Sequence, residues 1–311
     1  MGTIAELRIY DHREPASLRA ALDAGRAELH AIDRLMAVQR PDSDVSRINT
    51  HGATKPVRVD ARVVEVLEAA RAVSELTDGA FDVTVLPAAR AWGFTTGTPH
   101  VPAVAPAIAG FSRVAVDSAH GTVTLTAPHA QVDLGGIGKG YALDRVRGLL
   151  RAHGIRSAYL DLGGEVATIG HPPDAPYWRI GIRHPRDPGA IVGTVELGEG
   201  AVSTSGDGEQ FVIANGTRFG HIFDPRTGMP ARALVSATVV ASSATLADAL
   251  STAAVVLGPV ASGAALRRVG AEGVFIDSDD DGRLAVAATA GIRFHRLEGP
   301  TQGEARQGLE E

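Results

Sequence analysis

The chain has 311 residues, a net charge of −6 at pH 7 and no cysteine. The acidic balance and the scattered arginines exclude the electrostatic footprint of a nucleic-acid-binding protein, and the lack of cysteine excludes disulfides, thiolate metal sites and thiol nucleophiles. With 44% hydrophobic and 21% charged residues, the composition predicts a folded globular protein.

The N-terminal part of the chain predicts two amphipathic helices. Residues 1–15 show neither the basic nor the apolar region of a signal peptide, so we expect a cytoplasmic protein. Hydrophobic periodicity predicts, in order, a strand at 3–11, a helix at 15–38, a loop at 40–52 and a helix at 60–79. Asp60 is placed to cap the second helix and Gly79 to end it.

Short strands dominate the rest of the chain. Residues 95–110 are rich in Pro, Gly and Thr and predict a surface loop. Hairpins are expected at 113–126 and, around an Asn-Gly turn, at 210–223. Further strands are expected at 157–162, 178–182, 193–197 and 235–241. Strands gathered in runs between isolated helices favour an α+β fold over regular βαβ alternation.

The C-terminal part ends in polar sequence. The acidic residues 278–283 lack the ligand spacing and closing Glu of a calcium loop, so we expect a solvated turn between short strands. Residues 296–311 have the composition of a disordered tail.

A glycine-rich segment, "VDLGGIGKGYALD", is the most distinctive motif. An extended run ends at Asp133, four glycines follow within six residues, and a helix is expected to begin near Tyr141. Glycine lets a backbone approach a ligand closely, and a helix N-terminus attracts phosphate. The segment matches neither the Walker loop nor G-x-G-x-x-G, so a phosphate site and a strained structural turn both remain open. Lys139, a natural counter-charge for phosphate, favours the first.

The stretch "ATLADALSTAAVVLG", residues 244–258, predicts a buried helix that nevertheless holds an acid. Asp248 and Thr252 are four residues apart and therefore share one helix face. Carboxylate and hydroxyl oxygens are hard ligands of the kind that Mg²⁺ takes; a hydrogen-bonded core Asp is the alternative. The apolar run continues to residue 270 but is interrupted, so we expect no membrane span. The interrupting residues are Asp248, Gly258, Pro259 and Arg267.

Other polar clusters have structural and functional interpretations of similar weight. Gly163 and Gly164, flanked by Asp161 and Glu165, fit a bulge between strands or a second ligand turn. His221 stands at a strand end, and the turn after it holds Asp224, Arg226 and Thr227. Asp82 fits a strand start, and Ser46 and Asn49 fit the cap of a short helix.

Taken together and in order, these motifs resemble the ApbE family of FAD:protein FMN transferases over about residues 1–295. The matching segments are "MGT", "SRIN", "GAFDVTVLP", "VDLGGIGKGYALD", "LDLGGEVATIG", "WRIGIRHP", "AVSTSGD", "GHIFDPRTGMP" and "ATLADALSTA". The resemblance implies one α+β domain at 1–295, T-fold-like, with mixed or antiparallel sheets, flanking helices and two intimately joined lobes.

The resemblance also implies an activity and a set of site residues. Family members move the FMN half of FAD to a Thr or Ser hydroxyl of an acceptor flavoprotein, with Mg²⁺, and release AMP. The positions implied to contact FAD are Met1, Ala80, Phe81, Asp82, Asp133, Lys139 and Phe223. The positions implied for the metal are Gly136, through its backbone oxygen, Asp248 and Thr252, with Ser251 nearby. His221 is our candidate for the base that deprotonates the acceptor hydroxyl, and Asp224 is expected to orient it or to line the site.

Two other activities remain open at this point: an FAD pyrophosphatase, in which water replaces the hydroxyl acceptor, and an FAD-binding protein without catalysis. The chain departs from the family pattern at three positions. Gly138 replaces a usual alanine, Gly208 a common aromatic residue and His184 a frequent acid.

Overall fold

The structure, a computed structural model, describes residues 2–279 and 283–297. The predictions for Met1, for the centre of the acidic turn and for most of the tail lie outside the described residues. The helices are α1 (Pro15–Met36), α2 (Asp44–His51), α3 (Ala61–Leu76), α4 (Leu86–Ala91), α5 (Gly138–Ala152) and α6 (Ala244–Arg268), with short 3-10 turns at Val83–Val85 and Phe111–Arg113.

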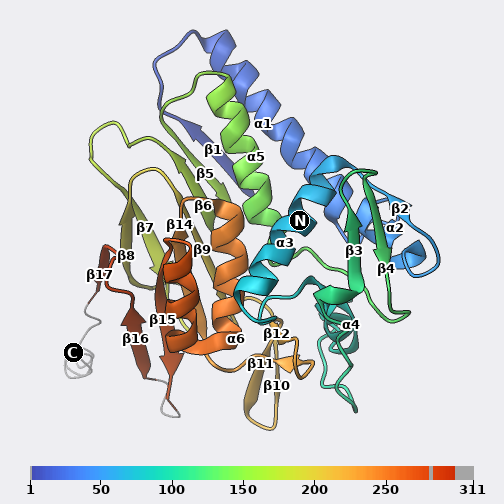
Figure 1. Ribbon diagram of the computed structural model, residues 1–311. Coiled ribbons are helices and arrows are strands. Elements are labelled where there is room, and N and C mark those ends of the chain that lie inside the picture. Colours follow the sequence, from blue (N-terminus) through green and yellow to red (C-terminus); the bar gives the residue numbers. More distant parts are fainter. Residues whose placement is uncertain (1, 280–282, 298–311) are drawn as a thin grey trace, which may run out of the picture.

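A seven-stranded antiparallel sheet forms the centre of the molecule (Figure 1). Its order is β1-β5-β6-β9-β14-β15-β16. The pairing of β1 with β5 therefore joins the N-terminal part of the chain to its middle. The strands are β1 (Ala5–Ile9), β5 (Ala158–Leu162), β6 (Glu165–Ile169), β9 (Ala201–Gly206), β14 (Ser236–Ala241), β15 (Glu272–Ser278) and β16 (Leu284–Ala288).

The other described strands form smaller antiparallel units. One three-stranded sheet has the order β17-β8-β7 and another β2-β4-β3, and two ribbons pair β10 with β11 and β12 with β13. Their bounds are β2 (Val57–Arg58), β3 (Val114–Asp117), β4 (Thr122–Leu125), β7 (Trp178–Arg183), β8 (Ile191–Leu197), β10 (Phe211–Ala214), β11 (Thr217–Gly220), β12 (Phe223–Asp224), β13 (Met229–Pro230) and β17 (Phe294–Arg296).

Both faces of the central sheet are covered by other elements. Alternate residues of its strands point to opposite sides, so each strand contributes side chains to two cores. Leu160 and Val239 face the helical core, whereas Val166 and Val274 pack with Trp178 under the β7–β8–β17 sheet. Helices α5 and α6 lie across the helical face (Figure 1). Because both faces of the sheet are buried, its strands carry apolar residues on both faces.

The predicted α+β class with two joined lobes is confirmed. Helices α2, α3 and α4 and the β2–β4–β3 sheet lie to one side of the central sheet (Figure 1). One continuous apolar core nevertheless runs from Leu67 of α3 through Leu143 of α5 to Leu250 of α6. The two lobes therefore share their packing.

Helix α6 is long and apolar enough to cross a membrane by length and composition alone, but 67% of its most apolar window is buried inside the molecule. It contacts β9, β14 and α5 and kinks at Gly258, where φ is 75°. It is thus the central packing element of the fold.

Two local predictions change, and one strand, β9, was not predicted. Helix α2 replaces the loop expected at 40–52: Ser43 caps it by accepting the amide of Ser46 at 3.0 Å, and Asp44 pairs with Arg47. Helix α5 begins at Gly138, earlier than expected, and residues 201–206 form strand β9.

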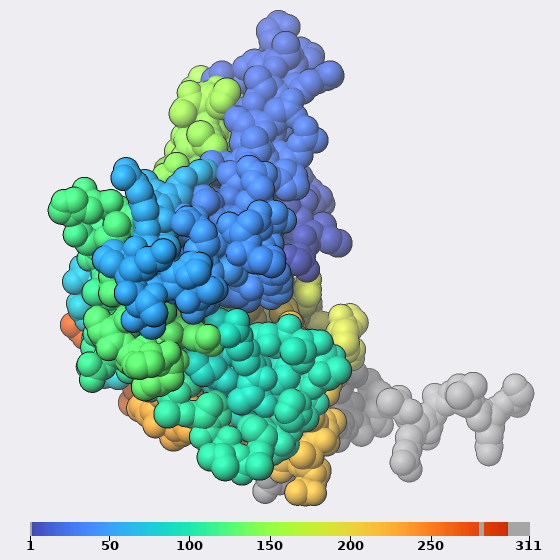
Figure 2. All heavy atoms as spheres, turned by 90° about the vertical axis from the view of Figure 1, so that its right-hand side faces the viewer, coloured from blue at the N-terminus to red at the C-terminus, as the bar shows by residue number. Residues whose placement is uncertain are grey.

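The expected surface loop, 95–110, contains neither helix nor strand. Figure 2 shows it, in teal, covering one side of the molecule beside the yellow-orange region of β10 to β13. Ile108 packs against the cluster around Phe223, and a Cβ added at Gly228 would meet the carbonyl oxygen of Pro106 at 2.2 Å. The loop therefore forms a wall over the ribbons that precede and follow His221.

Candidate active site

Helices α5 and α6 are locked together at their N-termini by two carboxylates. Asp248 of α6 accepts the amide N–H of Gly140 in the first turn of α5 at 2.9 Å. In return, Asp144 of α5 accepts the amides of Ala244 and Thr245, at 3.0 and 2.8 Å, at the start of α6. A Cβ at Gly140 would lie 2.1 Å from the carbonyl oxygen of Ala244, so only glycine permits this close crossing.

The predicted meeting of the glycine segment with Asp248 and Thr252 is present. A Cβ at Gly136 would stand 3.2 Å from the Thr252 hydroxyl and 3.4 Å from the ring of Phe81. The backbone of the segment thus lies in contact with the face of α6 that carries the acid.

The amides of the glycine segment are less available than we expected. Gly135 donates its N–H to Asp133 at 2.8 Å, Gly138 donates to the carbonyl of Leu134 at 2.7 Å, and Gly140 donates to Asp248. Lys139 is therefore the main group that this segment offers to an anion.

Lys139 forms an ion pair with Glu165, the first residue of β6. The Glu165 side chain is 5% exposed, whereas that of Lys139 is 29% exposed. The Glu165 side chain also forms a hydrogen bond with the side chain of Asp248. Two buried acids therefore meet beside one lysine.

Three charges are coupled at this point. Burial raises the pKa of Asp248, against the opposing effects of the Lys139 charge and of hydrogen bonds from the Gly140 amide and the Glu165 side chain. Burial and the charge of Asp248 raise the pKa of Glu165 well above its usual value. Burial lowers the pKa of Lys139, but the charges of Asp248 and Glu165 outweigh it, and the net shift is upward. Lys139 is therefore a permanent cation.

Hydroxyl groups continue the site from α6 to β9. Ser251 donates to the carbonyl of Asp248 at 2.9 Å, and its Oγ lies 2.8 Å from that of Ser205. Ser205 in turn lies 3.1 Å from the hydroxyl of Thr252. Ser251 itself is fully buried, and the hydroxyl that lies beside Gly136 is that of Thr252.

The oxygen atoms gathered here suit a hard divalent cation. The donor set is a carboxylate from Asp248, hydroxyls from Thr252 and Ser205, and the backbone of Gly136, and hard oxygens are what Mg²⁺ requires. The described residues contain no group of three or more His, Asp and Glu side chains that could form an all-protein cage. Mg²⁺ commonly binds with one or two carboxylates and completes its shell with water and phosphate, so the residues fit.

His221 lies at the other side of this region, directly after β11. Its Nδ1 is 3.4 Å from the carbonyl oxygen of Gln210, and its ring stands edge-on to Phe94. Burial lowers its pKa below 6.5, while the Gln210 carbonyl and the charge of Glu209 oppose that shift and Lys139 adds to it. The imidazole is therefore neutral at pH 7 and able to accept a proton.

Asp224 is not placed to orient His221. Its carboxylate accepts the backbone amide of Arg226 at 3.0 Å and pairs with the Arg226 guanidinium at 2.8 and 2.7 Å. No hydrogen bond joins Asp224 to His221 within the described residues. Glu209 is the carboxylate whose charge reaches His221 and Lys139.

Several of the residues expected to contact FAD also make contacts that shape the loops around the site. Asp82 accepts the amide and hydroxyl of Thr84, both at 2.7 Å, and the amide of Phe111 at 2.7 Å. Ala80 and Phe81 are buried beside it, and Phe223 packs on Trp92. Their side chains support the 80–84 turn and the aromatic wall.

Burial raises the pKa of Asp133, and its hydrogen bond from the Gly135 amide and the charges of Arg90 and His221 oppose that shift. The backbone just before it is held by Asn49, which donates to the carbonyl of Val132 at 2.8 Å and accepts its amide at 2.7 Å. The Asn49 side chain thus fixes a backbone segment that is distant in sequence and does not cap its own helix.

His184 and Gly208, two positions at which the chain departs from the family pattern, lie side by side. His184 Nδ1 accepts the amides of Arg186 and Asp187, at 3.2 and 3.0 Å, as a carboxylate would in such a turn. A Cβ at Gly208 would stand 3.2 Å from the carbonyl oxygen of Pro185. Arg186 then clasps Asp207 with two hydrogen bonds, so the 184–187 turn occupies the space beside Gly208.

Sequence reasoning missed some residues of this region. Glu165, Ser205, Glu209 and Asp144 were not assigned to the site. Glu165 carried a signal, because it is an acid opening a strand of five buried residues. Asp144 had one too, since it lies in the helix that follows the glycine segment.

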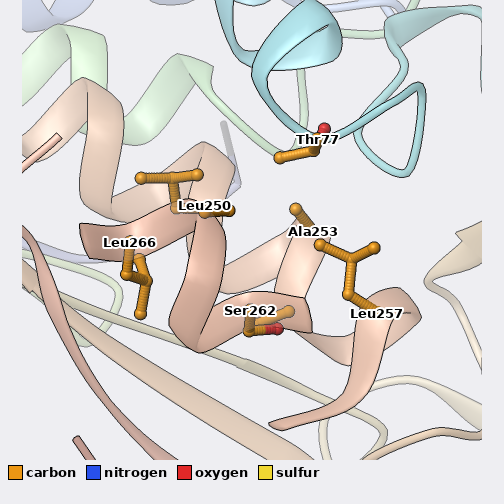
Figure 3. A pocket seen from close by; sticks show the side chains of 8 residues that line it. Thr77, Leu250, Ala253, Leu257, Ser262 and Leu266 are labelled. Atoms are coloured by element: carbon orange, nitrogen blue, oxygen red, sulfur yellow. The ribbon is translucent and has the colours of Figure 1, made fainter. Parts of the chain in front are cut away.

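A small apolar gap lies on the opposite face of α6 and is separate from the site (Figure 3). Its lining includes Leu250, Ala253 and Leu257 of α6, together with Thr77 at the end of α3. At 100° per residue these α6 positions point away from Asp248 and Thr252. The gap belongs to the packing between the lobes.

Comparison with known proteins agrees with this arrangement. The model of the ApbE family matches residues 1–275. The chain is 34% identical over 241 residues to a FAD:protein FMN transferase of Vibrio cholerae, covering 74% of this chain and 71% of that protein. It is 33% identical over 315 residues to one of Treponema pallidum, covering 94% and 85%. The crystal structure of the ApbE protein from Thermotoga maritima matches with a TM-score of 0.80 at 32% identity, covering 91% of this chain and 96% of that one. The chain therefore belongs to the ApbE family.

Proposed function

We propose that this chain is a FAD:protein FMN transferase that uses Mg²⁺ and modifies a Thr or Ser hydroxyl of an acceptor flavoprotein. The observation that carries the proposal is the packing of the glycine segment, which holds Lys139, against the face of α6 that holds Asp248 and Thr252. The family relation to FAD:protein FMN transferases supports the same activity.

The proposed reaction breaks the phosphoanhydride bond of FAD and forms a phosphoester bond to the acceptor. The acceptor oxygen forms a bond to the phosphorus of the FMN half of FAD, and the bond from that phosphorus to the bridging oxygen breaks. AMP leaves with the bridging oxygen, and His221 takes the proton of the acceptor hydroxyl. No electron is transferred.

Each of the chain's own groups has a separate task. Lys139, held as a cation by two carboxylates, attracts the pyrophosphate of FAD. The aromatic wall of Phe94 and Phe223, whose rings are 6.0 Å apart, shields His221 from water and keeps it neutral. Asp248, Thr252 and Ser205, with the Gly136 backbone, would hold Mg²⁺. When bound, Mg²⁺ neutralises the charge that develops on the leaving phosphate.

Co-expression with candidate flavoproteins tests the proposal, with in-gel flavin fluorescence and mass analysis of the modified residue as readouts. We expect a Thr or Ser that gains the mass of FMN, and release of one AMP for each flavin attached. The Asp248→Ala variant is expected to fold and to attach no flavin; full activity of that variant would overturn the metal assignment.

Incubation with FAD and Mg²⁺ without an acceptor separates transfer from hydrolysis. The proposal predicts little FMN and AMP in this mixture and a marked rise when the acceptor is added. Continuous production of FMN without an acceptor would identify a pyrophosphatase instead. Retention of FAD without any AMP release would identify a binding protein.

A further inference from the structure

One face of the β10–β11 ribbon is exposed. Val212 and Phe219 pack inward, against a buried aromatic cluster. Because side chains alternate along paired strands, Phe211, Ile213 and Arg218 lie together on the opposite face. Phe211 is 37% exposed and Ile213 is 60% exposed, and Figure 1 shows the ribbon at the lower edge of the molecule. This face is therefore open to a partner.

Arg218 is fixed by stacking, yet its hydrogen-bond donors are free. Its Cζ atom lies 3.6 Å from the centre of the Phe211 ring, so the guanidinium rests on that ring. Within the described residues, the Arg218 side chain makes no hydrogen bond and no ion pair. A guanidinium holds five N–H donors in a planar fork that matches the two oxygens of a carboxylate. Arg218 is thus pre-organised to bind a carboxylate.

The charges around Arg218 leave an excess of positive charge. Arg186 donates two hydrogen bonds to Asp207, at 2.5 and 2.8 Å, and so occupies both oxygens of that carboxylate. Burial and the charge of Arg186 lower the pKa of Arg218, and only Asp207 opposes that shift. Two guanidinium groups therefore share one acid, on a chain whose net charge is −6. An anionic group of a partner would be attracted to this cluster.

The cluster adjoins the proposed site through two strands. Asp207 follows the end of β9, two residues after Ser205, and a Cβ added at Gly220 would lie 2.8 Å from the Cβ of Asp207. His221 comes directly after Gly220, which is the last residue of β11. Three residues separate Arg218 from His221, and three residues of extended chain span about 10 Å. A carboxylate bound at Arg218 would therefore lie a few residues from a hydroxyl at His221.

We propose that the exposed face of the β10–β11 ribbon docks an extended segment of the acceptor flavoprotein, and that Arg218 binds a carboxylate of that segment. This inference rests on the proposed function, which supplies the acceptor. Phe211 and Ile213 offer the same segment an apolar surface. FAD carries its negative charge on the pyrophosphate, which is assigned to Lys139, so the carboxylate at Arg218 belongs to the acceptor. The spacing predicts an Asp or Glu about three residues from the target Thr or Ser.

A double-mutant cycle between the two proteins tests the docking. The probe is the flavoprotein that the wild-type chain modifies on co-expression, purified without its flavin. Each Asp or Glu within about five residues of its target hydroxyl is replaced by Asn or Gln, and AMP release is measured with the wild-type chain and with Arg218→Gln. With the wild-type chain, we expect the loss of one acid to raise the KM for the acceptor about tenfold at unchanged kcat.

The cycle also fixes what Arg218→Gln should and should not change. That variant should raise the acceptor KM about tenfold by itself, and the loss of the same acid should then have little further effect. Its KM for FAD should equal that of the wild-type chain. Additive losses, or an unchanged acceptor KM, would overturn the inference. A raised KM for FAD would assign Arg218 to FAD and would overturn it as well.

Failure of the proposed function gives a different result. A wild-type chain that modifies no candidate acceptor overturns the proposed function, and the docking inference with it. Normal transfer by the wild-type chain without any coupling between Arg218 and an acceptor acid overturns the docking inference alone.

Two further variants separate recognition of charge from loss of packing. Arg293 also lies over an aromatic ring, with its Cζ atom 4.1 Å from the centre of the Tyr177 ring. Tyr177 precedes the start of β7, whereas Arg186 follows its end, so Arg293→Gln should leave the acceptor KM unchanged. Arg218→Lys keeps the charge without the planar fork and should retain part of the coupling. A loss as large as that in Arg218→Gln would exclude charge recognition and overturn the inference.

Discussion

The amide of Gly140 donates a hydrogen bond to the carboxylate of Asp248 across 108 residues of chain. Gly140 lies in the first turn of α5 and Asp248 in the second turn of α6, and the contact brings the glycine segment against the acidic face of α6. The Asp248 side chain therefore has two roles: it holds α5 against α6, and it is the carboxylate proposed to bind Mg²⁺.

The first prediction concerns the close crossing at this contact. Gly140→Ala should lower the free energy of unfolding by about 1–3 kcal/mol or more, since overpacked sites force backbone shifts and the added Cβ would lie 2.7 Å from that of Asp248. Gly148→Ala is the matched control on the same helix, because nothing lies within 4 Å of its added Cβ. We expect that control to be stabilised by about 0.5–1 kcal/mol. Urea denaturation measures both changes. Equal effects of the two substitutions on the free energy of unfolding would contradict the close contact between α5 and α6 at Gly140.

The second prediction concerns His221. His221→Ala should retain FAD binding and lose transfer rate by a factor of about 10²–10⁴, the usual contribution of a general base. Burial lowers the His221 pKa below 6.5, so the neutral, active form should persist until the pH falls below that value. The acidic limb of kcat/KM should accordingly lie below pH 6.5 in the wild type and disappear in the variant. An unchanged single-turnover rate in His221→Ala would remove the residue from this role.

The third prediction uses the cap of α3. Hydrogen bonds from Arg62 lower the pKa of Asp60 to about 2, and its side chain also accepts the Arg62 amide at 3.0 Å. Asp60→Ala should therefore cost about 0.5–2 kcal/mol of stability at neutral pH. Because the folded-state pKa lies below the usual 3.8, the ionic part of this contribution is complete above that pH. It is lost as the pH falls toward 2. Unfolding curves of both proteins at several pH values should converge in acid; a constant difference would argue against the ion pair.

The fourth prediction concerns the clamp by Asn49 on the backbone of Val132. Asn49→Ala removes two hydrogen bonds of 2.8 and 2.7 Å and leaves a backbone amide and carbonyl unpaired. We expect a loss of about 1–3 kcal/mol in the free energy of unfolding. The affinity for FAD should also fall, because Asp133 and the glycine segment follow directly. Ser46→Ala is a control on the same helix, since its hydroxyl bonds only the Val38 carbonyl; a similar loss of FAD affinity there would assign the effect to α2 as a whole.

Local signals in the sequence predicted much of the secondary structure. The Asn215-Gly216 turn adopts the positive φ values, 50° and 75°, that such hairpins require. Asp60 and Gly79 flank α3 as expected. A short helix at α2 was only one interpretation of this segment, because it is short and polar; its cap is Ser43 and not Ser46 or Asn49, and its stability comes from Ser43, from Asp44 and from packing of Val45 and Ile48 in the core.

The site was harder to predict, since its contacts are separated widely along the chain. The helical spacing of Asp248 and Thr252 was sufficient to place them on one face. Glu165 could not be assigned to Lys139 from sequence, because their contact depends on the neighbouring positions of β6 and α5 in the fold. Asp224 failed as a partner of His221 for a local reason: Arg226, two residues away, already occupies its carboxylate.

The central sheet has a consequence for how activity is acquired during folding. Strand β1 pairs with β5, β6 pairs with β9, and α6 packs across β9 only after about 240 residues of chain are available. Contacts between such distant segments form slowly, since each requires the closure of a long loop. Lys139, Glu165, Ser205 and Asp248 therefore come together only when α5, β6, β9 and α6 have all packed together. A partly folded chain holds none of the finished geometry, and the return of flavin transfer during refolding will report the last step rather than the first.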